Sequence, residues 1–196
     1  MNPTSSLGPP PEDLQRFPAY RLGSTHVLAR IHKREHGVGF FSADGSGRFD
    51  LAPPEGTCYL GEEPLASFVE VFREASVVAE TLLLQKVLSL IRLRAEALLA
   101  DVTQPKSRKF GVTGEIHTTT DHATTQAWVA AFRRADFGGV RYRVRHDPAQ
   151  DLVGIALFGP GGAREDQFRT VSQSAIPTEL VTNAEERFGI VVLPIP

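Results

Sequence analysis

Apolar residues recur at helical spacing early in the chain, at i, i+3, i+4 and i+7. The residues at this spacing are Leu65, Phe68, Val69 and Phe72. The pattern predicts a helix over residues 62–74, because Pro64 is compatible with a first helical turn and Glu62 and Glu63 favour its positive end. Glu70 lies far round this helix from the apolar face, so its side chain is available for chemistry.

Two more helices are expected downstream, over residues 122–134 and 178–188. Thr120 or Asp121 can cap the first of them, and Gly138-Gly139 ends it. Its expected inner face consists of Thr124, Ala127, Trp128, Ala131 and Phe132.

Shorter apolar or alternating runs predict strands. They cover residues 20–31, 57–60, 86–93, 98–102, 140–145, 152–158, 168–176 and 190–195. Over residues 86–93, helix propensity competes with strand alternation, and a strand is the favoured assignment. Residues 76–85 are ambiguous between helix and loop, and residues 105–114 form a polar excursion with room for one helical turn. Strands outnumber helices and alternate irregularly with them, which indicates a mixed α/β (α+β) class.

Length and composition indicate how many domains the chain forms. The chain has 196 residues, of which 41% are hydrophobic, so one packed domain is expected. Proline, serine and glycine mark residues 1–18 as a flexible N-terminal arm, which leaves residues 19–196 as the domain.

Charge and cysteine content exclude several partners. A net charge of -2 provides no overall field for direct nucleic acid binding or for an anionic membrane. The single cysteine, Cys58, excludes an internal disulfide and a Cys-rich zinc site. No apolar run reaches the ~20 residues that span a bilayer, and no signal-peptide pattern is present, so we expect a cytoplasmic protein.

Two strings resemble known motifs but lack their context. Residues 32–36 read His-Lys-Arg-Glu-His, an inverted zinc-protease pattern that requires a helix. A β-prone run and a glycine-rich loop flank it, so a solvated loop is expected and no metal site. Gly45 and Gly47 belong to neither a dinucleotide fingerprint nor a P-loop, because no strand–turn–helix and no Gly-Lys-Ser/Thr surround them.

The stretch from residue 40 to residue 73 carries the candidate chemistry. A glycine loop presents Arg48, a short strand presents Tyr59, and the first helix presents Glu70. A cation, a phenol and a carboxylate suit a small polar ligand with negative charge at one end and an electron-poor centre at the other. Taken singly, each has an ordinary alternative: a surface arginine, a core tyrosine and a solvated glutamate.

These residues fall in a series of strings whose order and spacing resemble the RES domain family, over roughly residues 19–160. The strings are Arg30 at a strand end, Gly47-Arg48-Phe49, Tyr59-Leu60, Phe68-Val69-Glu70-Val71, Leu99 to Val102, Phe110 to Gly114, Thr125-Gln126-Ala127-Trp128, Gly139 to Tyr142 and Arg145-His146-Asp147-Pro148. The resemblance implies a fold related to ADP-ribosyltransferases, with a central mixed or antiparallel sheet and flanking helices.

The same resemblance implies a toxin of a toxin–antitoxin pair that acts on NAD⁺. The expected reactions are phosphorolysis or hydrolysis of the nicotinamide–ribose bond, with inorganic phosphate as a possible co-substrate, or ADP-ribosyl transfer. The implied partner is an Xre-like helix-turn-helix antitoxin that covers the active site, and a homo-oligomer within that complex is possible.

Residue roles follow from combining the resemblance with charge. Arg30 and Arg48 are expected to hold the diphosphate of NAD⁺, and Arg48 is also a catalytic candidate. Glu70 is expected to stabilise the ribosyl cation or to bind a ribose hydroxyl. Tyr59 is expected to stack on nicotinamide or to hydrogen-bond the ribose. Arg145 either attracts a phosphate nucleophile or is an ordinary arginine on the wet face of a strand.

The chain departs from the family at one position. The family often has a serine before the Arg-His-Asp-Pro segment, where this chain has Val144. That hydroxyl is either absent or supplied elsewhere, for example by Ser42 or Ser67. Two rival hypotheses therefore stay open: a mono-ADP-ribosyltransferase acting on a protein, and a non-catalytic module that retains the nucleotide pocket.

Overall fold

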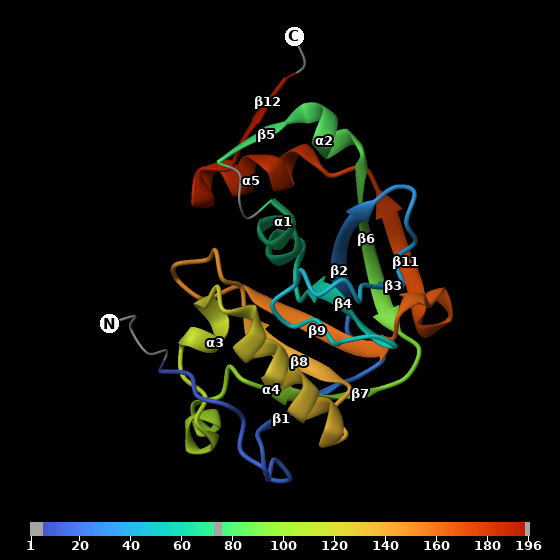
Figure 1. The fold of residues 1–196 in the computed structure, drawn as a ribbon. Helices are drawn as coiled ribbons and strands as arrows, with labels where there is room; N and C mark the ends of the chain where they lie inside the picture. The colour runs from blue at the N-terminus through green and yellow to red at the C-terminus, as the bar shows by residue number, and fades with distance from the viewer. Residues whose placement is uncertain (1–5, 73–75, 195–196) are drawn as a thin grey trace.

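The computed structural model describes residues 6–72 and 76–194 (Figure 1). Its strands are β1 (Ala19–Leu22), β2 (Leu28–Lys33), β3 (Phe40–Phe41), β4 (Glu55–Gly61), β5 (Val77–Ala79), β6 (Lys86–Leu93), β7 (Ala97–Asp101), β8 (Gly139–Arg143), β9 (Val153–Pro160), β10 (Gly162–Ala163), β11 (Phe168–Ser174) and β12 (Val191–Leu193). Its helices are α1 (Pro64–Phe72), α2 (Glu80–Leu84), α3 (Glu115–Thr118), α4 (His122–Arg134) and α5 (Thr178–Phe188), with short 3₁₀ turns at Pro105–Phe110 and Glu165–Gln167.

An eight-stranded sheet dominates the fold, with the order β1-β7-β8-β9-β4-β2-β6-β11. Strands β7 and β8 run parallel, and the other neighbours run antiparallel. Two small two-stranded sheets, β3 with β10 and β5 with β12, complete the strand pairing. The prediction of a mixed α/β class with a mixed sheet and flanking helices is therefore confirmed.

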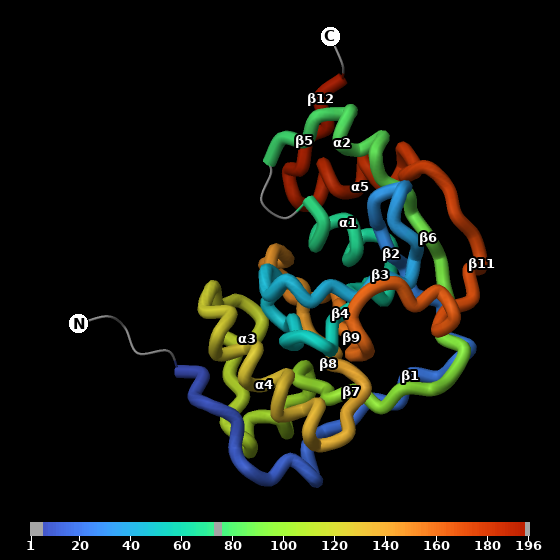
Figure 2. Tube along the Cα trace, turned by 45° about the vertical axis from the view of Figure 1, so that its right-hand side comes forward, coloured from blue at the N-terminus to red at the C-terminus, as the bar shows by residue number. Residues whose placement is uncertain are grey.

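Helices lie on the sheet at two places (Figure 2). Helix α1 packs on β2 and β4 and also contacts α5, while α4 packs on β8. Trp128 and Phe132 of α4 are fully buried against the sheet, which matches the predicted inner face. That face is rotated from the prediction, however, because Thr125 and Val129 are buried in place of Thr124 and Ala127.

Several predicted elements coincide with the observed ones. The strand over 86–93 and the helices over 122–134 and 178–188 have the expected bounds. Asp121 caps α4, where its carboxylate accepts a hydrogen bond from the Thr124 amide at 3.3 Å. The helix predicted over 62–74 corresponds to α1, and residues 73 and 74 lie outside the described residues.

Two strand predictions were wrong in their extent. Residues 20–31 form two strands, β1 and β2, because the chain turns at Gly23, where the carbonyl accepts a hydrogen bond from the His26 amide at 3.2 Å. The strand predicted over 140–145 ends at Arg143, so Arg145 lies in the turn that follows β8. The strand predicted over 190–195 corresponds to β12, and residue 195 lies outside the described residues.

The described part of the N-terminal arm, residues 6–18, lies against the domain. Leu7, Leu14 and Phe17 are buried in the same cluster as Trp128. The Trp128 indole donates a hydrogen bond to the Gly8 carbonyl at 2.9 Å. The predicted flexibility of the arm and the domain boundary at residue 19 stay predictions, and residues 1–5 lie outside the described residues.

No helix of the described residues is long and apolar enough to cross a membrane.

A glycine in β9 makes room for a large side chain of its neighbour. Gly154 lies opposite Tyr142 of β8, and a Cβ added at Gly154 would lie 2.3 Å from the Tyr142 ring carbon Cζ. The Tyr142 ring is fully buried, and its centroid lies 4.7 Å from that of the Phe49 ring. The absence of a side chain at Gly154 therefore allows the Tyr142 ring to lie beneath the Arg48 loop.

We expect Gly154→Ala to lower the free energy of unfolding by about 1–3 kcal/mol, because the buried Tyr142 ring must move to admit the methyl group. Urea denaturation monitored by circular dichroism measures this. Gly114→Ala is the control, since a Cβ there meets nothing within 4 Å, and its stability should equal or slightly exceed that of the native chain. A Gly154→Ala protein as stable as the native chain would contradict the packing argument.

Candidate functional site

The loop that carries Arg48 is held by its own hydrogen bonds. Gly45 adopts a positive φ of 75°, which glycine tolerates without strain. The Gly47 amide donates to the Asp50 carboxylate at 2.8 Å, and a Cβ at Gly47 would lie 2.4 Å from the Tyr59 hydroxyl. Only glycine therefore permits the close approach of this loop to β4.

The Arg48 guanidinium is buried, with 6% of the residue exposed. It lies over two aromatic rings, 4.8 Å from the centroid of Phe49 and 5.3 Å from that of Tyr142. It also donates a hydrogen bond to the His117 carbonyl. Burial lowers the pKa of Arg48, and the negative charge of Glu70 opposes that shift. The surface arginine considered as an alternative is thereby excluded.

Glu70 meets Arg48 across the gap between helix α1 and the loop. One carboxylate oxygen, Oε1, lies 3.7 Å from Arg48 Nη2, and the Glu70 side chain is 14% exposed. Helix α1 reaches this position because its apolar residues, including Leu65 and Phe68, are buried on the opposite side. Removal of either partner of an ion pair this buried destabilises the protein, because the other partner is left as an uncompensated buried charge.

The hydroxyl of Tyr59 in β4 forms hydrogen bonds with other groups of the protein. The phenol donates to Asp50 Oδ1 at 2.8 Å and accepts a hydrogen bond from the Phe49 amide at 2.9 Å. Burial, and secondarily the Asp50 charge, raises the pKa of Tyr59 well above its ordinary value, so the phenol stays protonated. Its hydroxyl thus anchors the Arg48 loop, and Tyr59 also lines the cavities described next.

Two adjoining cavities of about 370 Å³ and about 130 Å³ open beside these residues. Both are lined by Ser42, Tyr59, Glu70 and Val71. Asp50 lines the larger cavity, and Arg30 and Phe40 line the smaller one. Residues from a loop, a strand and a helix thus share one hollow.

Arg30 and Arg145 differ from Arg48 in their surroundings. The Arg30 guanidinium lies at the smaller cavity and donates to the carbonyls of Val38 and Phe40, the latter at 2.9 Å. Arg145 lines neither cavity but lies near enough to lower the pKa of Arg48, after the larger contribution of burial. The structure therefore brings Arg30, Arg48, Tyr59 and Glu70 together, and it leaves Arg145 at the edge.

The hydroxyl that Val144 lacks has two candidate replacements, and they are placed differently. Val144 is buried in the core beside α1 and lines neither cavity. Ser67 lines the smaller cavity, but its hydroxyl accepts a hydrogen bond from the Ile31 amide at 2.7 Å. Ser42 lines both cavities and is the hydroxyl best placed to reach a ligand.

Sequence reasoning missed two residues of the site, Asp50 and His117. Asp50 accepts from the Gly47 amide and from the Tyr59 hydroxyl, and burial raises the pKa of its carboxyl. Its position two residues after Arg48, in a turn, is a signal that sequence alone could have offered. His117 lies on α3, a four-residue helix that the polar pattern did not predict, and no local signal links it to Arg48.

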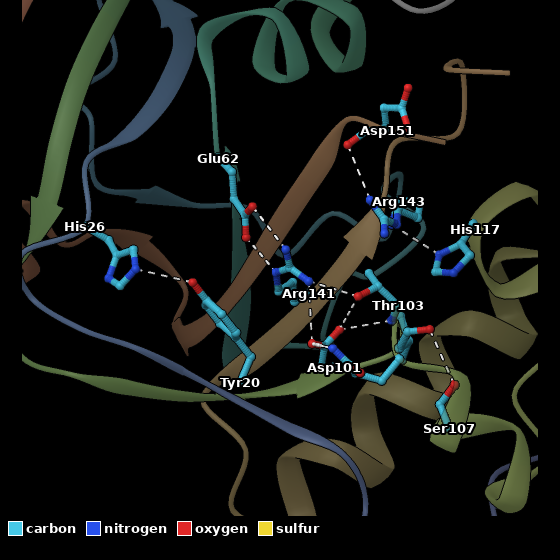
Figure 3. A network of polar contacts seen from close by, with 12 residues as sticks. Tyr20, His26, Glu62, Asp101, Thr103, Ser107, His117, Arg141, Arg143 and Asp151 are labelled. Atoms are coloured by element: carbon cyan, nitrogen blue, oxygen red, sulfur yellow. Dashed lines mark hydrogen bonds and ion pairs between the residues drawn. The ribbon is translucent and has the colours of Figure 1, made fainter. Parts of the chain in front are cut away.

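A second polar network lies on the sheet beside the site (Figure 3). Arg141 Nε is 2.6 Å from a Glu62 oxygen, and Arg141 Nη1 is 3.5 Å from Asp101. The Arg143 amide in the same strand donates to His117 Nδ1 at 3.2 Å. Since Glu62 lies two residues before the first residue of α1, Pro64, this network ties the start of the Glu70 helix to β8.

Within residues 6–72 and 76–194, no group of three or more His, Cys, Asp or Glu side chains is arranged to hold a metal ion. The His32–His36 string in particular has its first histidine in β2, where His32 Nε2 lies 2.9 Å from the Ser89 hydroxyl.

Known proteins resemble the chain at the level of family and at the level of fold. The family model described as RES domain matches residues 19–177. No curated protein matches the chain. Among solved structures, the chain is similar to one described as "Crystal structure of the M.tuberculosis MbcT-MbcA toxin-antitoxin complex", with a TM-score of 0.65 and 20% sequence identity. The similarity covers 88% of this chain and 93% of that chain, and at this identity it shows a common fold.

The environment of His117 predicts a pH dependence of stability. Burial, then the charges of Arg48 and Arg143, lowers the pKa of His117 from 6.5 to about 4. Between these values the unfolded chain binds a proton that the folded chain does not, so stability falls as the pH falls. We expect a loss of about 2 kcal/mol between pH 7 and pH 5 from this residue.

Urea denaturation of the native chain and of His117→Gln at both pH values measures that contribution. Gln keeps an acceptor for the Arg143 amide but does not titrate. The free energy of unfolding of the His117→Gln protein should therefore fall by about 2 kcal/mol less than that of the native chain between pH 7 and pH 5. Burial also lowers the pKa of His32, and that contribution is the same in both proteins and cancels. Parallel losses in the two proteins would refute the role of His117.

Proposed function

Since the chain belongs to the RES domain family, we propose that it degrades NAD⁺ by cleaving the bond between nicotinamide and ribose, as the toxin of a toxin–antitoxin pair. The observation that carries this proposal is the Glu70 carboxylate, which lines both cavities next to the Tyr59 ring with Arg48 bound behind it. The family relation supports NAD⁺ as the substrate, and the geometry of the site supports the roles given to these residues.

The lining of the larger cavity favours the nicotinamide end of NAD⁺. Its described residues include the carboxyl groups of Asp50 and Glu70 and the ring of Tyr59, with no lysine or arginine among them. The nicotinamide ring of NAD⁺ is flat and positively charged, so acidic groups and an aromatic face both attract it. The diphosphate would be repelled there, and Arg30 at the smaller cavity is the better placed cation for it.

Bond cleavage develops positive charge on the ribose. The C1′–N bond breaks, its electron pair leaves with neutral nicotinamide, and C1′ becomes an oxocarbenium-like centre. A carboxylate beside that carbon stabilises the transition state more than the ground state, which is the requirement for catalysis. We assign this role to Glu70. Phosphate or water then adds to C1′ from the open side, and water loses a proton in doing so.

Arg48 acts through Glu70 in this proposal. Its position 3.7 Å from Glu70 orients the carboxylate, and its burial beneath the loop leaves it poorly placed for the diphosphate. Tyr59 contributes its ring, because its hydroxyl is bonded to Asp50. Arg145, at the edge, remains available to attract a phosphate nucleophile.

The same relation supports an antitoxin as the partner of this chain. The similar solved structure is titled as a toxin–antitoxin complex, and we propose that this chain also binds an antitoxin, an Xre-like helix-turn-helix protein that covers the cavity. We further propose that the chain acts in the cytoplasm, where NAD⁺ is abundant, and that it assembles with further copies in the complex.

We expect Glu70→Gln to reduce NAD⁺ consumption by about 100-fold or more, because the neutral amide cannot balance the charge at C1′. Release of nicotinamide from NAD⁺, followed by chromatography, measures the rate. Glu63→Gln is the matched control, an exposed carboxylate next to the start of the same helix, and it should retain the native rate. Equal rates for native and Glu70→Gln proteins would remove Glu70 from the mechanism.

Mass spectrometry of the products, with and without inorganic phosphate, identifies the acceptor. Free ADP-ribose or ADP-ribose 1″-phosphate is the expected product. ADP-ribose attached to a protein would instead indicate a mono-ADP-ribosyltransferase. Calorimetric binding of NAD⁺ without any turnover would indicate a binding module.

A further inference from the structure

Helix α4 holds the backbone of the Arg48 loop from outside the cavity. The Thr125 hydroxyl donates to the Arg48 carbonyl at 2.6 Å. The neighbouring Gln126 amide lies 3.0 Å from both the Gly45 carbonyl and the Gly47 carbonyl. Two consecutive side chains of one helix therefore bind three carbonyls of one loop, although 77 residues separate Thr125 from Arg48.

The Thr125 hydroxyl has a second possible acceptor within its own helix. A threonine inside a helix usually donates to a carbonyl three or four residues earlier, and the His122 carbonyl lies 3.1 Å from this hydroxyl. A hydroxyl has one proton to donate, and the 2.6 Å contact with the Arg48 carbonyl is the shorter one. Thr125 is fully buried, so losing the hydroxyl would leave the Arg48 carbonyl without its bond in a dry environment.

The opposite side of the loop is held by other groups. The Gly47 and Phe49 amides donate to Asp50 and Tyr59, as described above. The Gly47 and Arg48 carbonyls are thus bound by side chains of α4, and the Phe49 amide is bound by Tyr59 of β4. These bonds fix the peptide planes on both sides of Arg48. Displacing them moves the guanidinium, and catalysis is sensitive to misplacement of about 1 Å.

We infer that Thr125 and Gln126 are positioning residues for Arg48: α4 sets where the guanidinium meets Glu70 without touching the ligand cavity. Neither side chain lines either of the two cavities. The expected effect on the rate of catalysis rests on the proposed function. The expected effect on the position of Arg48 rests on the hydrogen bonds alone.

Kinetics of Thr125→Val and Thr125→Ser test the catalytic consequence. Valine keeps the shape but removes the donor, and serine restores the donor. We expect Thr125→Val to lower kcat about 10-fold with little change in KM, because Arg48 acts in the transition state, and Thr125→Ser to stay within about 2-fold of the native chain. Thr124→Val is the matched control, since its hydroxyl donates to Asp121 at 2.7 Å and touches no part of the loop.

Adding Arg48→Lys separates positioning from general damage. If Thr125 acts through Arg48, Thr125→Val should reduce kcat little further in an Arg48→Lys protein. A full 10-fold loss in that background would show an independent role and overturn the inference.

A second measurement does not depend on NAD⁺. The coupling between Arg48 and Glu70 is obtained from urea midpoints of Arg48→Met, Glu70→Gln and the double variant. We expect this coupling to shrink when Thr125→Val is added and to return with Thr125→Ser. An undiminished coupling overturns the inference, whatever the NAD⁺ assay gives, whereas absence of NAD⁺ turnover in the native chain counts against the proposed function alone.

If Thr125→Val does not fold, Gln126→Met carries the same tests at a less buried position. It removes the donor to the Gly45 and Gly47 carbonyls while keeping the length of the side chain. A diminished coupling with normal folding supports the inference, and an unchanged coupling overturns it.

Discussion

The ion pair between Arg48 and Glu70 is the interaction on which the arrangement of this protein depends. Its two ends come from a glycine loop and a helix, and both side chains are almost excluded from water. Taking two charges out of water costs several kcal/mol for each ion, so the surroundings must compensate. Here the compensation comes from two aromatic rings beneath the guanidinium and from the His117 carbonyl.

The rest of the site is organised around keeping that pair in place. The small Gly154 admits Tyr142 under the guanidinium, and the Tyr59 hydroxyl serves the loop and not the cavity. The residues that line the two cavities include the acidic Asp50 and Glu70 and the aromatic Tyr59, with Arg30 at the smaller cavity. Such a surface is complementary to a flat cation attached to an anion, which is the charge distribution of NAD⁺, the proposed substrate.

Long periodic elements were predictable because their signal is local. Helices α4 and α5 were expected with their observed bounds, since each carries apolar positions at helical spacing within the element. Strand β6 was also expected with its observed bounds, although helix propensity competes with strand alternation there. The single strand expected over 20–31 failed because one turn at Gly23 outweighs strand propensity on both sides. Very short elements such as α3 and β3 have too few residues to produce a period, so only packing decides them.

The sequence by itself determined the elements that carry Arg48, Tyr59 and Glu70, the mixed class and, through its ordered strings, the family. The tertiary structure alone decided which groups line the two cavities. It turned the Tyr59 hydroxyl inward to Asp50, placed Arg48 behind Glu70, and brought Thr125 and His117 of distant helices to the same loop. The physical reason is that hydrogen bonds and ion pairs between residues 69 or 77 positions apart depend on how the sheet and helices pack, which no local pattern records.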